Sequence, residues 1–251
     1  MKKKITFLPV LVASAAFYSC STDRIDGNIN KIINHNSQIS ILLGESKDKY
    51  DFSYSSTGII QSISNEKNNK KGIFIYDSEN RLIAIKSTTK ISEFNYSGNQ
   101  ITSISSKTLD GKRNGTHNIT YSDGGNTIQI DTKWEGTSLT SKDIFKFKDG
   151  NLTNADLGGK QLNFYYDDKI NPFGTVNKEI ALLEGLTIGN FGGLYLASKN
   201  NVIRIEQKYR EDKTFSIFKT LENTYDNNGR IIKITDKDLL KKETYTNISY
   251  N

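Results

Sequence analysis

The chain has 251 residues and a formal net charge of +6; 35% of its residues are hydrophobic and 10% are aromatic. The aromatic content argues against a disordered chain. Three of the positive charges are Lys2, Lys3 and Lys4, so residues 20–251 carry only +3. Because the remaining lysines are scattered among acidic residues, we expect a solvated surface and no nucleic-acid partner.

The N-terminus has the three-part form of a secretory signal peptide. Its lysines precede an apolar stretch from 5 to 17, which is shorter than the roughly 20 residues of a membrane-spanning helix. Cys20, the only cysteine, follows directly and resembles the lipidation cysteine of a bacterial lipoprotein. We therefore expect a signal peptide (1–19), a lipidated cysteine with a polar tether (20–38) and a single β-repeat domain (39–251).

This start predicts export and a lipid anchor in the outer membrane, on either its periplasmic or its cell-surface face. Phe17 and Tyr18 are bulkier than the residues that usually precede a lipidated cysteine. The alternative is therefore a free Cys20 after an ordinary signal peptide. No cysteine remains for a disulfide framework or a thiolate metal site.

A degenerate unit recurs along the rest of the chain. It consists of two aromatic residues two positions apart, a turn, and two aliphatic residues three positions apart. The key aromatic residues of five copies are 20 to 26 positions apart, which marks a repeated supersecondary unit: Tyr54, Tyr76, Tyr96, Tyr121 and Phe147. Each copy predicts a β-hairpin, because β-branched and aromatic residues flank clusters of Ser, Asp, Asn and Gly. Asp149-Gly150 and Asn228-Gly229 are strong turn signals.

The repeats predict an all-β fold, a large antiparallel meander of about a dozen strands. We expect a strongly curved sheet or a partly closed barrel with one short helical or irregular crossover. An outer-membrane barrel is the rival, but it needs an outward apolar band, and many such positions here are Ser, Asn, Lys or Gln. The three-residue spacing of the aliphatic pairs leaves two options: a bulge returns both to one face, or both faces are partly covered.

Two copies, YDSENRLIAI and YDNNGRIIKI, resemble the YD repeat, in which glycine, arginine and an aliphatic residue follow tyrosine and aspartate. Only these two copies keep the arginine, as Arg81 and Arg230, and Ser replaces Asp in three others. Together with the lipoprotein-like start, YDDKINPFG and a later KNNV stretch, residues 40–251 resemble a family of bacterial lipoproteins of unknown function. This resemblance implies a porin-like antiparallel β fold, and it supplies no catalytic residues.

Residues 171–200 break the hairpin pattern. Pro172 ends a strand, and the apolar residues after it have no hairpin turn signals. We expect a crossover that docks on the sheet and buries Phe173, Leu183 and Phe191, because apolar surface left in water loses stabilisation. The alternative is an irregular wall of a ligand site.

The search for reactive side chains finds no catalytic or metal-binding constellation. His35 and His117 are the only histidines, and neither has a metal-ligand spacing. Asp167 and Asp168 would face opposite sides of a strand, which suits neither a shared acid/base pair nor a metal clamp. We therefore predict no catalytic residue, no metal ligand, no cofactor and no enzyme.

The function that the sequence favours is a non-enzymatic binding or structural role at the cell envelope, with a glycan, lipid or envelope protein as the candidate partner. A carbohydrate- or lipid-binding lipoprotein is the more specific alternative, and an enzyme of unknown class is the least favoured. The speculative ligand-binding residues are aromatic: Trp134, Tyr166, Phe173, Phe191 and Tyr195. Trp134 either stacks on a sugar ring or, as we favour, anchors the core.

Overall fold

The computed structural model describes residues 39–43, 48–55, 60–65, 70–112, 114–171, 178, 182, 197–238 and 243–250. Within these residues the chain forms sixteen strands and one short 3-10 turn, η1 (Asp123–Gly125). The first eight strands are β1 (Ile39–Leu43), β2 (Asp48–Tyr54), β3 (Ile60–Asn65), β4 (Lys70–Tyr76), β5 (Leu82–Ser87), β6 (Lys90–Ser97), β7 (Gln100–Thr108) and β8 (Asn114–Ser122). The others are β9 (Thr127–Trp134), β10 (Thr140–Lys148), β11 (Asn151–Asp156), β12 (Lys160–Ile170), β13 (Asn200–Tyr209), β14 (Ser216–Tyr225), β15 (Ile231–Asp238) and β16 (Glu243–Tyr250).

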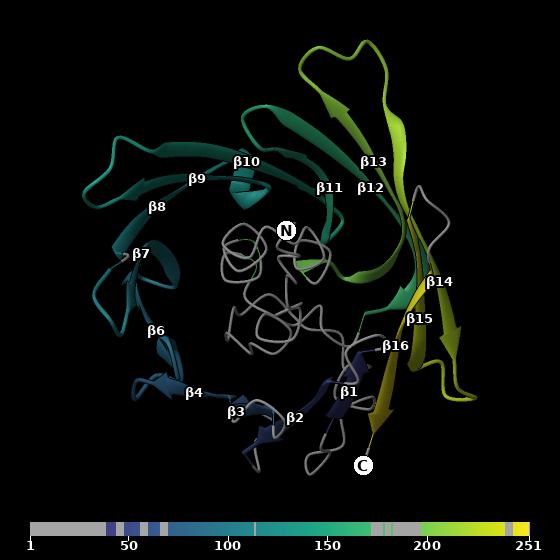
Figure 1. Ribbon diagram of the computed structural model, residues 1–251, viewed down its shortest axis with the longest axis horizontal. Helices are drawn as coiled ribbons and strands as arrows, with labels where there is room; N and C mark the ends of the chain where they lie inside the picture. Colours follow the sequence, from purple (N-terminus) through teal and green to yellow (C-terminus); the bar gives the residue numbers. More distant parts are fainter. Residues whose placement is uncertain are drawn as a thin grey trace, which may run out of the picture.

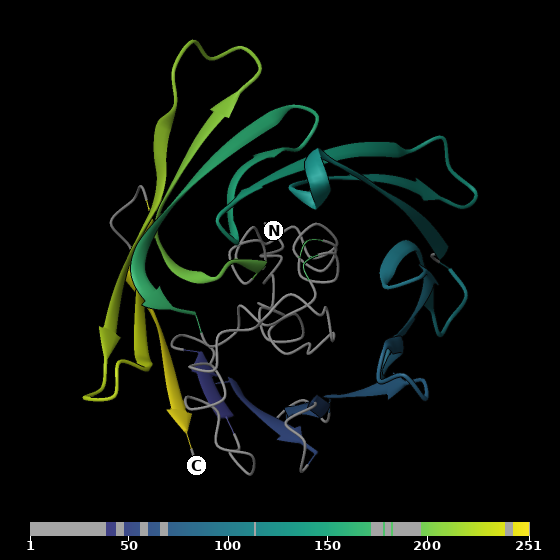
Figure 2. The ribbon, with the colours of Figure 1, turned by 180° about the vertical axis from the view of Figure 1, so that it is seen from behind.

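Each strand pairs antiparallel with its neighbours in sequence, so the sheet is one continuous meander. β1 also pairs with β16, with Ile39 opposite Tyr250, and this pairing joins the two ends of the sheet. Figures 1 and 2 show the resulting ring of strands from its two ends. The predicted all-β antiparallel fold is therefore confirmed, with more strands than the dozen expected.

A β-bulge explains the three-residue spacing of the aliphatic pairs. In the β6–β7 hairpin, Asn95 lies opposite Ser103 but Tyr96 lies opposite Ile101, so Thr102 is an extra residue without a cross-strand partner. Ile101 and Ile104 consequently face the same side, and both are buried. The same shift recurs in the hairpins β2–β3, β4–β5, β10–β11 and β14–β15. Of the two options that the sequence left open, the bulge is the one that the fold uses.

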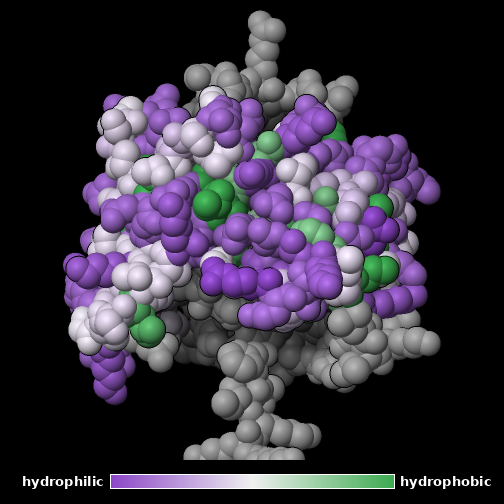
Figure 3. Space-filling view, turned by 90° about the horizontal axis from the view of Figure 1, so that it is seen from above, coloured by the Kyte–Doolittle hydropathy of each residue, from purple (hydrophilic) through white to green (hydrophobic). Residues whose placement is uncertain are grey.

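The two faces of the ring differ in polarity. Along β9 the buried residues Ile128, Ile130 and Thr132 alternate with less buried ones. The side of the ring seen in Figure 3 is largely hydrophilic, and the buried side chains lie on the inner face. Twenty-one of them form one apolar cluster, which includes Phe74, Phe94, Phe145 and Phe164. Among the described residues, no helix is both long enough and apolar enough to cross a membrane.

The key tyrosines join each repeat to the one before it. The Tyr96 hydroxyl donates to the Leu82 carbonyl oxygen at 2.9 Å, and Leu82 is the first aliphatic residue of the preceding hairpin. The same bond recurs three times: Tyr121 to Ile101 at 2.9 Å, Tyr166 to Leu152 at 2.7 Å and Tyr250 to Ile231 at 3.0 Å. Each acceptor lies beside a bulge, where the ladder is interrupted. The tyrosine therefore satisfies a carbonyl that the register shift removes from the regular ladder.

The two full YD copies use their aspartate and arginine in the same way. Asp77 accepts hydrogen bonds from the backbone N–H and the Nε of Arg81, at 2.9 and 2.8 Å. Asp226 accepts the corresponding bonds from Arg230 at the same distances. The arginines then lie over the tyrosine rings of the following repeat, Tyr96 at 5.2 Å and Tyr250 at 4.6 Å. The aspartate closes the turn, and the arginine links that turn to the next hairpin.

Antiparallel connections alternate between the two ends of the ring. We call the end with turns 77–81, 98–99, 123–126, 149–150 and 226–230 the YD rim. The opposite rim has turns 88–89, 109–112, 135–139, 157–159 and 210–215.

Candidate functional site

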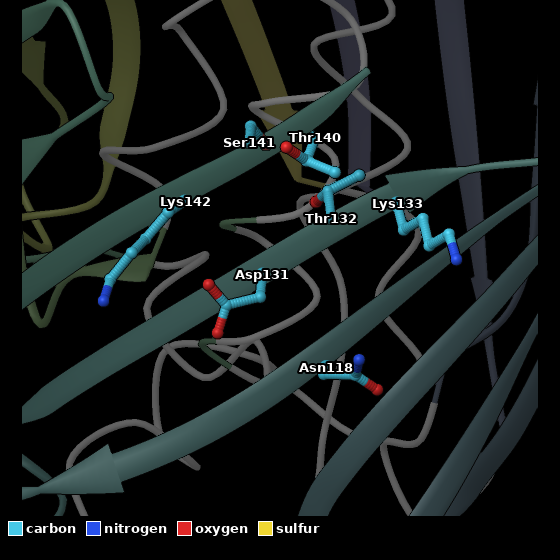
Figure 4. Close-up of a pocket in the computed structure, with 7 residues that line it drawn as sticks. All are labelled: Asn118, Asp131, Thr132, Lys133, Thr140, Ser141 and Lys142. Carbon is cyan, nitrogen blue, oxygen red and sulfur yellow. The ribbon is translucent and has the colours of Figure 1, made fainter. Parts of the chain in front are cut away.

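Two depressions lie on the strand ends near the opposite rim. The first, which we call the sheet depression, has a volume of about 460 Å³ and crosses β8, β9 and β10. Its lining residues are drawn in Figure 4: Asn118, Asp131, Thr132, Lys133, Thr140, Ser141 and Lys142. The second, which we call the basic depression, has a volume of about 170 Å³ and lies where the turn 157–159 meets the end of β13. Its lining residues are Asp156, Gly158, Gly159, Lys160, Gln161, Lys208, Tyr209 and Arg210.

Strand register produces the sheet depression. Asp131 lies opposite Asn118 on one side and opposite Lys142 on the other. These three side chains therefore form a row across three strands, on the same side of the sheet in Figure 4. The Asp131 carboxylate accepts a hydrogen bond from Gln129 Nε2 at 2.6 Å. The row presents an amide, a carboxylate and an ammonium to the same volume, so it offers both donors and acceptors.

Buried polar side chains lie behind this row on the inner face. His117 Nδ1 lies 2.9 Å from the Thr132 hydroxyl, whereas its Nε2 is buried without a hydrogen-bond partner. Burial, with a contribution from the positive charge of Lys90, lowers the pKa of His117 to about 4. Burial likewise raises the pKa of Asp143, which accepts a bond from the Ser141 hydroxyl. Both groups favour their neutral forms, because the inner face excludes water.

The basic depression is shaped by a tight turn. Gly158 has φ = 75°, a left-handed conformation that favours glycine. The Arg210 backbone N–H donates to the Gly159 carbonyl at 3.1 Å, and Arg210 Nη2 donates to the Gly158 carbonyl at 2.9 Å. Arg210 is thus held against the turn on one edge of the depression. Gly158 and Gly159 have no side chains, so the wall is low and the cavity remains open at this point.

The ammonium groups of two lysines in this site lie over aromatic rings. The Lys160 ammonium lies 4.3 Å from the ring centroid of Phe218 and 5.3 Å from that of Tyr209. Lys208 lies 5.2 Å from the ring centroid of Phe215. Burial lowers the pKa of Lys160 below its ordinary value. Ring quadrupoles oriented toward an ammonium offset part of this desolvation, so the cations are held in place on apolar surface.

The two depressions are neighbours. A Cβ atom on Gly158 would lie 4.0 Å from the Lys142 carbonyl oxygen, and Lys142 lines the sheet depression. The charges of Asp156 and Asp131, one from each depression, both raise the pKa of Asp143. Together the two linings contain five basic side chains, Lys133, Lys142, Lys160, Lys208 and Arg210, but only two acidic ones, Asp131 and Asp156.

Of the residues singled out from the sequence, Trp134 and Tyr166 can be placed, and neither lines a depression. Trp134 is half-buried and meets the His117 ring edge-on at 5.7 Å between centroids. A Cβ on Gly115 would come within 2.8 Å of the Trp134 ring, so the indole packs directly on that glycine. Tyr166 donates to the Leu152 carbonyl and shares a hydrogen bond with Ser198. Both contacts belong to the packing of the domain.

Other sequence predictions lie outside the described residues. These are Cys20, His35, Phe173, Leu183, Phe191 and Tyr195, together with the signal peptide and the tether. Within the crossover, four of the residues that can be placed are buried, Asn171, Leu182, Ala197 and Ser198, whereas Lys199 is exposed. The docking of the three apolar residues named from the sequence therefore stays a prediction.

Asp167 and Asp168 have different surroundings. Asp167 accepts hydrogen bonds from the Tyr225 hydroxyl and from Asn223 Nδ2. The Asp168 side chain is exposed and lies 3.5 Å from Lys169 Nζ. Among the described residues, no group of three or more His, Cys, Asp or Glu side chains could hold a metal ion.

Sequence reasoning missed the residues of both depressions. The Gly158-Gly159-Lys160 tripeptide was the available signal, but Gln161 breaks the phosphate-loop pattern. The basic residues that meet there come from β12 and from the end of β13, about 50 positions apart. Their proximity depends on strand pairing, which a single sequence does not specify.

Comparisons with known proteins identify the fold. No family model matches the chain, and no curated protein matches it. Among solved structures, a porin-like protein from Bacteroides vulgatus is similar, with a TM-score of 0.57 and 13% identity over 85% of this chain and 97% of that one. A porin-like protein from Bacteroides uniformis has a TM-score of 0.46 and 11% identity over 85% of this chain and 96% of that one. The Photorhabdus luminescens Tc holotoxin pore has a TM-score of 0.28 and 12% identity over 80% of this chain and 8% of that one. The first of these likenesses shows that the chain has a porin-like β fold.

Proposed function

We propose that this protein is a non-enzymatic, lipid-anchored protein of the bacterial cell envelope that binds a ligand at its opposite rim. The observation that carries the proposal is the polarity of the described strands: their buried residues form one apolar cluster, and the side of the ring seen in Figure 3 is largely hydrophilic. A barrel embedded in lipid needs the opposite arrangement, with an outward-facing apolar band around its circumference. The domain is therefore suited to an aqueous compartment beside the membrane.

Charged residues on the outer face support this placement. Lys107 and Glu93 project from the outer side of β7 and β6, and their side chains are 61% and 55% exposed. Lys146, which lies within β10 and not at its end, is also exposed. A lysine on the lipid face of a barrel costs about 2–4 kcal/mol at the bilayer midplane. Several such residues on one small barrel would add up to a prohibitive cost.

The position of β1 indicates at which rim the tether joins the domain. Ile39, the first residue of β1, pairs with Tyr250 and with Phe52, so the chain enters the ring at the YD rim. The tether of residues 20–38 would span roughly 65 Å when fully extended. A lipid on Cys20 would then join the YD rim to the membrane through a tether long enough to leave the opposite rim in solvent.

The test is the fate of a Cys20→Ala variant, with Ser21→Ala as the matched control. We expect Cys20→Ala to lose incorporation of a labelled fatty acid and to leave the membrane fraction, while the control keeps both. If Cys20→Ala stays in membranes washed with sodium carbonate, the barrel itself is embedded and the proposal is wrong. If the Cys20→Ala variant is released but the unaltered chain never carries lipid, the proposed export stands and the proposed lipid anchor is wrong.

A further inference from the structure

We propose that the two depressions at the opposite rim form one site for an acidic saccharide, a chain of sugar rings that carry carboxylate or phosphate groups. This inference rests on the proposed function, because it names the ligand class of the rim that would face solvent. In this arrangement the outer side of the basic depression takes the anionic group, and the sheet depression takes the hydroxyl groups of the neighbouring sugar.

The basic depression has the charge that an anion needs. Lys160, Lys208 and Arg210 line it, and Asp156 is its only acidic lining residue. The two Asp156 oxygens already accept bonds from the Gly158 backbone N–H and from Gln161 Nε2, each at 3.2 Å. An anion on the outer side of the depression therefore meets Lys208 and Arg210, and one carboxylate whose charge is already shared with donors. Bonds from cationic donors to an anion are about twice as strong as neutral ones.

Strand register sets the side of the sheet on which each side chain of the basic depression lies. Lys208 lies opposite Gln161, which lies opposite Asp156, so these three share the outer side. Lys160 lies opposite Tyr209, one position along, so these two side chains lie on the inner side. At about 170 Å³, the depression accommodates one charged group and part of the sugar ring that carries it.

The sheet depression supplies the other half of the recognition. Asn118, Asp131 and Lys142 point to one side of the sheet, and Thr140 adds a hydroxyl group (Figure 4). Sugar hydroxyls both donate and accept hydrogen bonds, and this set offers a carboxylate acceptor between an amide and an ammonium. Because Gly158 and Lys142 adjoin, one ligand can reach both depressions without crossing a side-chain barrier.

The same observations disfavour a nucleic acid. Asp131 lies at the centre of the sheet depression, and Asp156 lies in the basic one. A ligand with one phosphate for every residue would bring charge to both carboxylates, whereas a saccharide can place its neutral hydroxyl groups there. Like charges brought together cost affinity and are used to reject wrong partners.

The first experiment measures calorimetric binding of a hyaluronan tetrasaccharide, in which acidic and neutral sugars alternate, to the protein purified from its producing cells. Its fully methyl-esterified form is the matched neutral ligand. We expect the acid to bind at least about tenfold more tightly than the ester, and its affinity to fall about tenfold from 0.05 to 0.5 M NaCl as exposed charges are screened. Equal affinity of acid and ester, or tighter binding of an oligothymidylate of the same charge, would overturn the proposal.

The second experiment places the site. Lys208→Gln and Arg210→Gln should each weaken binding of the acid about fivefold to tenfold, with little effect on the ester. Lys213→Gln, which lies in the next turn but outside the lining, is the matched control and should bind as the unaltered chain does. Because Arg210 also holds the turn, thermal melts accompany each variant, and Lys208→Gln decides the matter if Arg210→Gln is unstable. Unchanged affinity in Lys208→Gln would mean that the anion binds elsewhere.

The binding test does not depend on the anchor. If Cys20→Ala shows that the protein is not lipidated but the acid still binds at Lys208, the proposed anchoring fails and the saccharide site stands. If the anchor is found but neither the acid nor the ester binds, the ligand class is wrong and the envelope role remains.

Discussion

The two rims of the ring are built from the same kind of hairpin connection but have opposite characters. At the YD rim, four hairpins are linked to a neighbouring strand by a tyrosine hydroxyl on a bulge carbonyl and, in two copies, by an Asp–Arg pair. At the opposite rim, large apolar residues stand in solvent: Leu139 is 66% exposed and Leu109 is 53% exposed. The comparison indicates that the repeat motif specifies the assembly of the ring at one end and leaves the other end to vary, as loops that carry function do.

The largest expected difference between the rims is in stability. Leu82 lies beside the YD-rim bulge and is 1% exposed, so Leu82→Ala should lower the free energy of unfolding by about 2–5 kcal/mol. Leu139→Ala at the opposite rim should change it by less than about 0.5 kcal/mol. Urea denaturation measures the free energy of unfolding of both variants. Equal losses of unfolding free energy in the two variants would show that Leu139 is packed against other groups and does not stand in solvent.

The inner face behind the opposite rim should make stability depend on pH. The pKa of His117 is lowered by burial to about 4 in the folded chain, against about 6.5 when unfolded. The unfolded state therefore binds more protons between these values, so stability is fully present above about pH 6.5 and falls by up to about 3 kcal/mol as the pH drops toward 4.

Denaturation midpoints at a series of pH values measure this loss. His117→Gln should flatten the profile across the window, because glutamine does not titrate, whereas variants at the exposed Lys133 should not. A profile that keeps its full slope in His117→Gln would assign the pH dependence to another group.

Removing one tyrosine hydroxyl should have a smaller effect. Tyr96→Phe deletes the bond to the Leu82 carbonyl and leaves the ring in place, so a loss of about 1 kcal/mol is expected. Tyr121→Phe should behave alike, because it makes the same bond to Ile101. The exposed Tyr209 is the matched control, and its Tyr→Phe variant should unfold at the midpoint of the unaltered chain. If all three variants are neutral, the hydroxyl bonds do not hold the repeats together.

The smallest effect is expected from the turn ion pair. Hydrogen bonds from Arg230 lower the pKa of Asp226 below its ordinary value, against an opposing effect of burial. A carboxyl with a lowered pKa stabilises the fold above its unfolded pKa, and that stabilisation disappears as the pH falls through the folded value. Asp226→Asn should therefore lower the melting temperature slightly at pH 7 and not at all in strong acid. An equal decrease at both pH values would point to the hydrogen bonds to the backbone rather than to the charge.

Much of the fold could be predicted, because local patterns carry it. Aromatic pairs such as Phe94 and Tyr96 share one face by the two-residue period of a strand, and the turn residues between them identify hairpins. The looser copy at residues 119–130 is informative, because Ile128 and Ile130 are two positions apart and its hairpin has no bulge. Local spacing thus reports the register directly. The Asp–Arg pair within one turn is local for the same reason.

The sequence by itself determined the hairpins, their turns and the shared face of their aromatic pairs, since each depends on residues only a few positions apart. The tertiary structure alone decided that β1 meets β16, that Tyr96 reaches the preceding hairpin and that Lys208 and Arg210 adjoin Gly158. It also brought together the basic residues of the opposite rim as a candidate site, away from Trp134 and Tyr166. These contacts join positions far apart in the chain, and they exist only once strand twist and register have closed the sheet on itself.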